Sequence, residues 1–146
     1  MYKKILVAID ESERAFRALN EAFSLAKCLS AKLVVLYVNK SNVYGSLSKP
    51  LDIKKIEEKI QKEMVLHAEE IWYKATSLLP TLADEAEFIK RENKNIAKAI
   101  VDVAQEEDVD LIVLGGRNLP GASSLILRSV TNTVLGITDK AVLVVR

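Results

Sequence analysis

The chain has 146 residues, 49% of them hydrophobic, and its 21 basic residues nearly balance its 20 acidic residues. This length favours a single domain, residues 1–146, that buries a core without disulfides or structural metal, and the apolar content excludes a disordered chain. The balanced charge gives no broad electrostatic footprint for nucleic acid or an anionic membrane, so neither is expected as a partner.

The first predicted element is a strand over residues 4–9, KILVAI, a run without polar alternation that suits burial on both faces. The apolar run in this amino-terminal segment is too short for a signal peptide core or a membrane span, so we expect a cytoplasmic location. Asp10 and Ser12 then offer side-chain oxygens of the kind that cap helices. The amphipathic helix that follows carries apolar residues at helical spacing from Ala15 to Leu29.

Two residue types that often carry chemistry occur once each. Cys28 lies inside the helical pattern beside Leu25 and Leu29 and is interpreted as a small packing residue. A single cysteine excludes a disulfide framework and a cysteine cluster for zinc. His67 lies at the edge of the apolar stripe of the next helix, and the sequence supplies neither a second metal ligand nor a serine elbow. We therefore predict no metal site and no catalytic residue.

Residues 32–38, KLVVLYV, predict a second buried strand. Residues 39–50, NKSNVYGSLSKP, lack periodicity and are interpreted as a long loop whose role the pattern leaves open. A long helix follows, with an apolar stripe from Ile53 to Leu78 and with Pro80 after it. The outer face of this helix is a mixture of lysine and glutamate that needs no partner.

The second half of the chain continues the alternation. Residues 84–90, DEAEFIK, predict a polar strand of the kind found near a sheet edge. The remaining pattern predicts a helix from Ile96 to Ala104 capped by Asn93 or Asn95, a strand over residues 111–114, a helix from Ile126 to Ile137 and a last strand over residues 141–145.

Five short strands alternating with four helices are typical of an α/β protein with a single open parallel sheet. Each crossover between parallel strands is expected to be right-handed. Such sheets bind ligands beyond the carboxyl ends of their strands, where the strand order reverses. The candidate site by position therefore contains Asp10, Asn39 and the loop from Gly115 to Ser124.

The loop after the fourth strand has the composition of a phosphate-binding turn. The strand ends at Gly115 and Gly116, and glycines before a helix start let backbone N–H groups approach an anion closely. The same glycines can also serve the geometry of the turn alone. Ala122 stands where a Walker sequence has its phosphate-binding lysine, and no GxGxxG follows the first strand. The sequence thus offers binding elements without a catalytic apparatus.

Four segments in order form a combined signature: KKILVAIDESERAFRALNEAFSLAK, AKLVVLYV, DVDLIVLGGRN and SVTNTVLGITDKAVLVV. Through them the chain resembles the universal stress protein family over essentially its whole length. The resemblance implies the sheet order 3-2-1-4-5 with helices on both faces. It also implies a homodimer formed by antiparallel pairing of the last strands, residues 141–145. An apolar terminal strand that would otherwise be an open edge suits such pairing.

One branch of that family binds ATP through a G-x2-G-x9-G-[S/T] motif, and the other branch lacks both motif and nucleotide. Gly115 matches the first glycine and Ser129 the hydroxyl, but Asn118 and Arg128 replace the second and third glycines. Asparagine is a mild replacement because it tolerates left-handed backbone. Arg128 either obstructs the phosphates or binds them as a charged fork.

Carried over residue by residue, the resemblance implies a site for ATP or another adenine nucleotide, with or without Mg²⁺. Adenine and ribose would contact Ala8, Ile9, Asp10 and Val38, and the phosphates would contact Gly115, Gly116, Arg117, Asn118, Arg128, Ser129, Val130 and Thr131. The leading hypothesis is a cytoplasmic, dimeric stress-response protein that binds the nucleotide as a sensor or switch without significant catalysis. The alternative is a nucleotide-free dimeric interaction module. An enzyme of related fold ranks below both, because no general base, nucleophile or metal cluster is visible.

Overall fold

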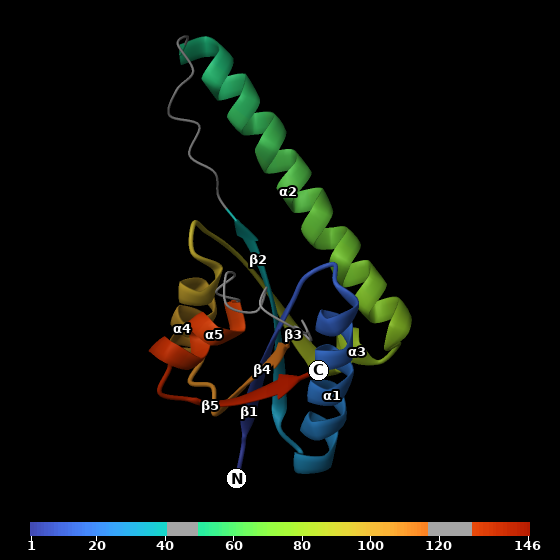
Figure 1. Cartoon of the computed structure of the whole chain (residues 1–146). Helices are drawn as coiled ribbons and strands as arrows, with labels where there is room; N and C mark the ends of the chain where they lie inside the picture. Colours follow the sequence, from blue (N-terminus) through green and yellow to red (C-terminus); the bar gives the residue numbers. More distant parts are fainter. Residues whose placement is uncertain (41–49, 117–129) are drawn as a thin grey trace.

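A computed structural model describes residues 1–40, 50–116 and 130–146 of the chain. Its centre is a five-stranded sheet in the order β3-β2-β1-β4-β5, in which every neighbouring pair of strands is parallel (Figure 1). The strands are β1 (Lys4–Ile9), β2 (Lys32–Lys40), β3 (Ala86–Asn93), β4 (Leu111–Gly115) and β5 (Ala141–Val145). The predicted α/β class and the strand order 3-2-1-4-5 are confirmed.

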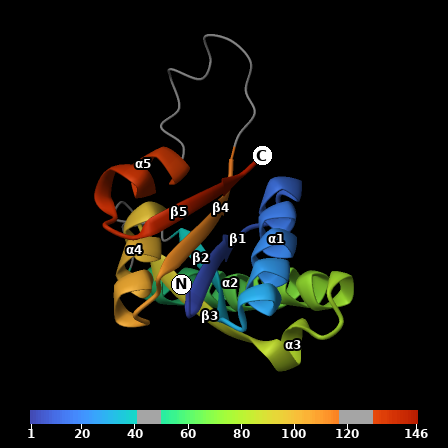
Figure 2. The ribbon, with the colours of Figure 1, turned by 90° about the horizontal axis from the view of Figure 1, so that it is seen from below.

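Helices cover both faces of this sheet, as expected (Figure 2). In chain order they are α1 (Glu13–Leu29), α2 (Pro50–Leu78), α3 (Leu82–Glu85), α4 (Ile96–Glu106) and α5 (Val130–Ile137). α1, α2 and α3 lie on one face, and α4 and α5 lie on the other. Each face therefore has its own apolar core, and the central strands are covered on both sides.

The first strand shows how a run without polar alternation serves two cores. Ile5, Val7 and Ile9 pack on the α1 face, whereas Leu6 packs on the α4 face. The side chains divide in this way because successive residues of a strand point to opposite faces. None of the four is more than 5% exposed. Burying each such side chain contributes about 1.5–3 kcal/mol to folding.

The start of the third strand differs from the prediction. β3 begins at Ala86 rather than at residue 84, because the preceding residues form the short helix α3. α3 buries Leu82 completely under the sheet. The prediction of four helices was therefore wrong, because it missed the short helix α3. Of the two predicted caps for α4, Asn95 is the N-cap, and its side chain accepts a hydrogen bond from the Lys98 N–H at 3.1 Å.

Both ends of the segment predicted as a loop, residues 39–50, belong to regular elements. β2 continues to Lys40, because Asn39 and Lys40 still pair with β3. α2 begins at Pro50, and proline is well tolerated in the first turn of a helix. Residues 41–49 lie outside the described part of the chain, as does Ile126, where the last helix was predicted to begin.

The interpretation of Cys28 as a packing residue was wrong, because its side chain is exposed. α1 buries the face that carries Ala22 and Ala26. Two residues beyond Ala26 the helix has turned by about 200°, which directs Cys28 away from the sheet.

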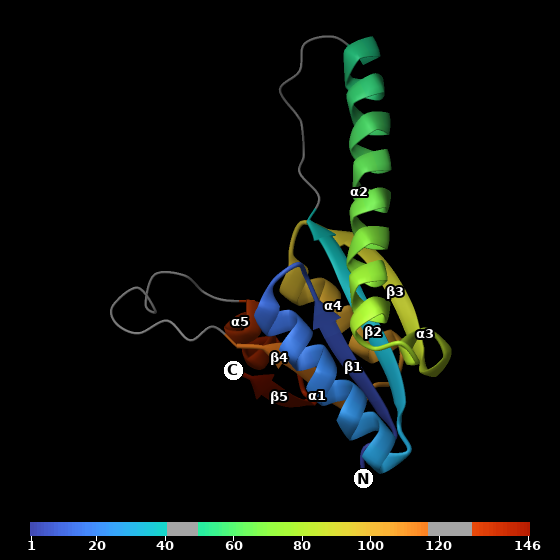
Figure 3. The ribbon, with the colours of Figure 1, turned by 90° about the vertical axis from the view of Figure 1, so that its right-hand side faces the viewer.

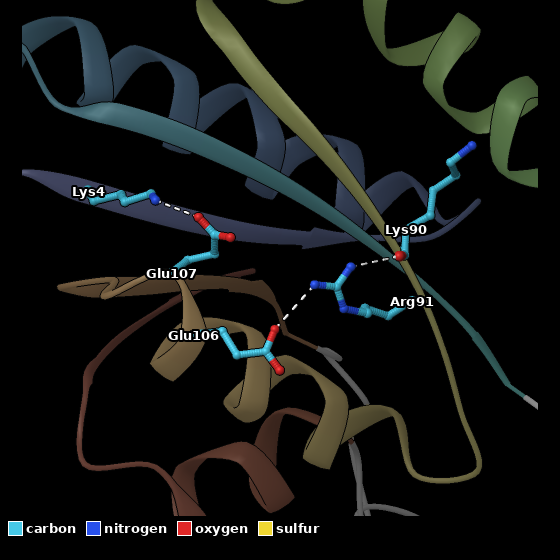
Figure 4. A network of polar contacts seen from close by, with 5 residues as sticks. All are labelled: Lys4, Lys90, Arg91, Glu106 and Glu107. Atoms are coloured by element: carbon cyan, nitrogen blue, oxygen red, sulfur yellow. Dashed lines mark hydrogen bonds and ion pairs between the residues drawn. The ribbon is translucent and has the colours of Figure 1, made fainter.

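Ion pairs join the carboxyl-terminal end of α4 to the sheet (Figure 4). Lys4 of β1 lies 2.6 Å from Glu107, which caps α4. Arg91 of β3 lies 3.2 Å from Glu106, and it also donates a hydrogen bond to the carbonyl oxygen of Lys90 at 3.1 Å. Such solvent-accessible pairs contribute about 0–1 kcal/mol each, so the apolar cores and not these contacts hold α4 in place.

The long helix α2 is anchored by its second half only. Ala68, Ile71 and Ala75 are buried against the sheet, and Figure 3 shows the first half extending past the end of β2. The apolar residues of that first half, from Ile53 to Met64, stay partly exposed. The 29 residues of α2 would be long enough to span a bilayer, but no helix among the described residues is apolar enough to do so.

Candidate functional site

A cavity of about 230 Å³ lies at the carboxyl ends of β1 and β4. These two strands pair directly, with Val7 opposite Val113, and the strand order reverses between them. The cavity therefore lies at the position where open parallel sheets bind ligands. Its walls come from the ends of β1, β2 and β4 and from the first turns of α1, α4 and α5.

Most of the predicted site residues that the structure describes line this one cavity. They are Ala8, Ile9, Asp10, Val38, Gly115, Val130 and Thr131. Gly116 instead contacts β5: its N–H donates to the carbonyl oxygen of Val145 at 2.7 Å, and a Cβ on it would lie 2.7 Å from Val144 Cγ1. Arg117, Asn118, Arg128 and Ser129 lie outside the described residues.

Asp10 and Ser12 form the turn that starts α1. Ser12 is the N-cap, and its Oγ accepts a hydrogen bond from the Ala15 N–H at 3.3 Å. Asp10 Oδ1 in turn accepts from the Ser12 N–H at 2.8 Å and from the Ser12 hydroxyl. Oδ2 of Asp10 has no hydrogen-bond partner among the residues that the structure describes. Asp10 thus supports the cap of α1 with one of its two carboxylate oxygens.

Gly115 is required by the packing of α1 on β4. A Cβ at this position would lie 2.8 Å from the backbone oxygen of Arg14 and 3.1 Å from Arg14 Cγ. Thr131 closes the other side, since its Oγ1 donates to the Gly115 carbonyl oxygen at 3.1 Å. Backbone and side chains from α1, β4 and α5 therefore meet at one glycine.

Sequence reasoning missed six residues of the cavity as site residues: Ser12, Arg14, Ala15, Ile96, Ile100 and Leu114. The rule that ligands bind beyond the strand ends could have found those in the first turns of α1 and α4, because these turns follow β1 and β3. Val38, Ile96 and Ile100 belong to the apolar core of the α4 face. The cavity thus combines an apolar contact group with a polar group formed by Arg14, Gly115 and Thr131.

Tyr37 does not line the cavity but lies next to it on β2, where it pairs with the cavity residue Ile9. Its side chain is almost fully buried. Burial, and then the charges of Glu11 and Asp10, raise the pKa of Tyr37 to about 12. The phenol is therefore neutral at pH 7, and the stability that it contributes is lost as the pH rises from 10 through 12.

His67 packs its ring against Tyr37, edge to face, with centroids 5.8 Å apart. It lies 3.8 Å from Glu11 and 3.9 Å from Glu70, and its side chain is 45% exposed. Within residues 1–40, 50–116 and 130–146 no three ligand-type side chains come together as a metal site would need. The position of His67 thus fits a half-exposed contact between α2 and the start of α1.

Comparisons with known proteins agree over the whole chain. The model of the Universal stress protein family matches residues 1–146. The chain is 33% identical to universal stress protein YxiE of Bacillus subtilis, with 100% of both chains covered. It is similar to the structure of universal stress protein UspA from Lactobacillus plantarum, with 27% identity, a TM-score of 0.76, and 99% and 98% of the two chains covered. It is also similar to a universal stress protein from Archaeoglobus fulgidus in complex with dAMP, with 26% identity, a TM-score of 0.62, and 99% and 98% covered.

Proposed function

Because the chain belongs to the universal stress protein family, we propose that it is a stress-response protein whose cavity at the ends of β1 and β4 binds ATP or another adenine nucleotide. One observation carries this proposal. Residues expected at opposite ends of the nucleotide, Asp10 and Val38 for the nucleoside and Gly115 and Thr131 for the phosphates, line a single cavity although they are far apart in sequence.

The chemistry of the walls supports the same ligand. Adenine is flat and largely apolar on its faces, which suits the contact group of Val38, Ile96 and Ile100. Oδ2 of Asp10, which has no hydrogen-bond partner among the described residues, can accept a hydrogen bond from a ribose hydroxyl or an amino group. Sites for small molecules are typically apolar cavities with a small number of polar groups at defined positions. The solved structure of a relative that is similar over 99% of this chain is a complex with dAMP.

We propose binding without significant turnover, as expected of a sensor or switch. One carboxylate oxygen of Asp10 supports the start of α1, and the neutral phenol of Tyr37 cannot act as a base at pH 7. Asp10 is also the one carboxylate among the described residues of the cavity, so Mg²⁺ would be held mainly by the nucleotide phosphates.

A second function, a nucleotide-free dimeric interaction module, is favoured by one observation. Gly115 is explained by the close approach of α1, so its presence needs no ligand.

In either case we propose a homodimer through β5, whose outer edge is unpaired within the described chain.

Isothermal titration calorimetry with ATP separates the two functions. We expect saturable binding by the natural chain and about tenfold weaker binding by Asp10→Asn, which removes one charge-assisted hydrogen bond. Asp84→Asn on α3, away from the cavity, is the matched control and should bind like the natural chain. If the natural chain shows no saturable binding at millimolar ATP, the interaction module is favoured. ATP turnover that is lost in Asp10→Asn would instead indicate an enzyme.

A further inference from the structure

We infer that Arg14 is the side chain that binds the phosphate of a nucleotide in this cavity, so that the site selects adenine nucleotides over adenosine. The inference rests on the function proposed above. Arg14 lies outside the glycine motif, in the first turn of α1.

The packing of α1 places Arg14 at the tip of β4. The residue lies in the first turn of a 17-residue helix and lines the cavity. Its Cγ would be 3.1 Å from a Cβ on Gly115, so its side chain leaves the helix directly over the glycine at which β4 ends. Gly115 is also bound by Thr131, which makes this the polar end of the cavity.

Arg14 has no ion-pair partner among the described residues. Arg14 is the one cation among the described residues that line the cavity, and no carboxylate in the described ranges lies within 4.0 Å of its guanidinium. By contrast, Lys4, Arg91 and Lys98 each have a carboxylate partner. A half-buried cation without a counter-ion is partly desolvated without compensation, and an anionic ligand supplies that compensation.

The other walls of the cavity indicate which end of the nucleotide lies next to Arg14. The group of Val38, Ile96 and Ile100 is apolar and takes the base, whereas the start of α1 adds the positive end of a helix dipole to Arg14. Arg14 therefore faces the phosphate rather than the adenine. A guanidinium also presents two parallel N–H donors to a phosphate, which a lysine ammonium does not reproduce.

The test compares ATP, AMP and adenosine by calorimetry in three proteins: the natural chain, Arg14→Gln and Arg17→Gln. Arg17 follows on the same helix, is exposed and does not line the cavity, so it is the matched control. We expect Arg14→Gln to weaken ATP and AMP about tenfold or more while adenosine affinity stays the same. Arg17→Gln should change none of the three. The ATP affinity of the natural chain should also fall more steeply with added salt than that of Arg14→Gln.

Three other outcomes of this experiment would overturn the inference, and each has a different meaning. If Arg14→Gln binds ATP as the natural chain does, Arg14 does not bind phosphate, and the proposed nucleotide site stands. If it loses ATP and adenosine equally, Arg14 supports the shape of the cavity rather than the phosphate. If the natural chain binds neither compound, the proposed function itself has failed. Far-UV circular dichroism and thermal melting verify that Arg14→Gln is folded.

Discussion

At the scale of single residues, Gly115 meets a packing requirement of the fold. α1 lies so close to β4 that any side chain at this position would collide with the backbone of Arg14. The backbone of α1 cannot move aside without disturbing the buried residues Ala15 and Ala18 behind it. The glycine is therefore needed for the fold even when no nucleotide is bound.

We predict that Gly115→Ala lowers the free energy of unfolding by about 1–3 kcal/mol, as overpacking does in other cores. Urea denaturation measures this change. The matched control is Gly136→Ala on α5, where a Cβ meets nothing within 4 Å. In a helix that substitution raises stability by up to about 1 kcal/mol, because alanine is the better helix former. Equal stability of Gly115→Ala and the natural chain would contradict the contact with Arg14.

The sequence allowed part of the site to be predicted, residue by residue. Asp10 and Gly115 follow apolar strands, so the rule of carboxyl ends was enough to place them together. The same rule reaches the first turn of α1 but does not single out Arg14, because the contact of Arg14 with Gly115 depends on how closely α1 approaches β4, and these residues are distant in sequence. Cys28 was misplaced because its apolar neighbours Leu25 and Leu29 are themselves only partly buried.

At the scale of elements, α2 has one apolar stripe but two environments. The stripe is continuous in the sequence from Ile53 to Leu78, yet only the half that lies over the sheet is buried. Trp72 marks the buried half, since its ring stacks on Phe88 of β3 with centroids 4.5 Å apart. Periodicity predicts which face of a helix is apolar, but not how far the sheet beneath it reaches.

We predict that Ile71→Ala lowers the free energy of unfolding by about 2–4 kcal/mol, because Ile71 is 4% exposed and its removal leaves a cavity. Ile56→Ala on the same stripe should cost less than about 1 kcal/mol, because this side chain keeps part of its contact with water. Urea denaturation followed by Trp72 fluorescence measures both. Similar losses in the two variants would mean that the first half of α2 is also packed.

The elements themselves were predictable where apolar runs are long. β1, β2 and β5 were found within two residues of their ends because buried strands read as uninterrupted apolar segments. α3 was not predicted, because a four-residue helix is too short to show a helical period. The extension of β2 to Lys40 depends on pairing with β3, which no local pattern encodes.

At the scale of the whole molecule, β5 is an edge strand with apolar side chains. Among the strands that the structure describes, it pairs with β4 alone, and Leu143 at its centre is 39% exposed. Exposed apolar edges favour pairing with another chain unless they are blocked. The strand order followed from the resemblance of four segments to a known family, whereas the homodimer through β5 stays a prediction.

We predict that the natural chain is a dimer and that Leu143→Lys is a monomer, because a charge at the centre of the edge opposes strand pairing. Val65→Lys on α2 is the matched control, since Val65 is 40% exposed and lies away from β5. Sedimentation equilibrium measures the mass of each protein. A natural chain that sediments as a monomer, or a dimeric Leu143→Lys, would contradict the edge as the interface.

The protruding half of α2 would distort a mass estimated by gel filtration, although not one measured by sedimentation equilibrium. A helix of 29 residues is about 44 Å long, and much of this one stands clear of the sheet. A particle with such an arm meets more hydrodynamic drag than a sphere of 16.2 kDa. It should elute early from a gel-filtration column, so even a monomer would pass for something larger when calibrated against globular standards.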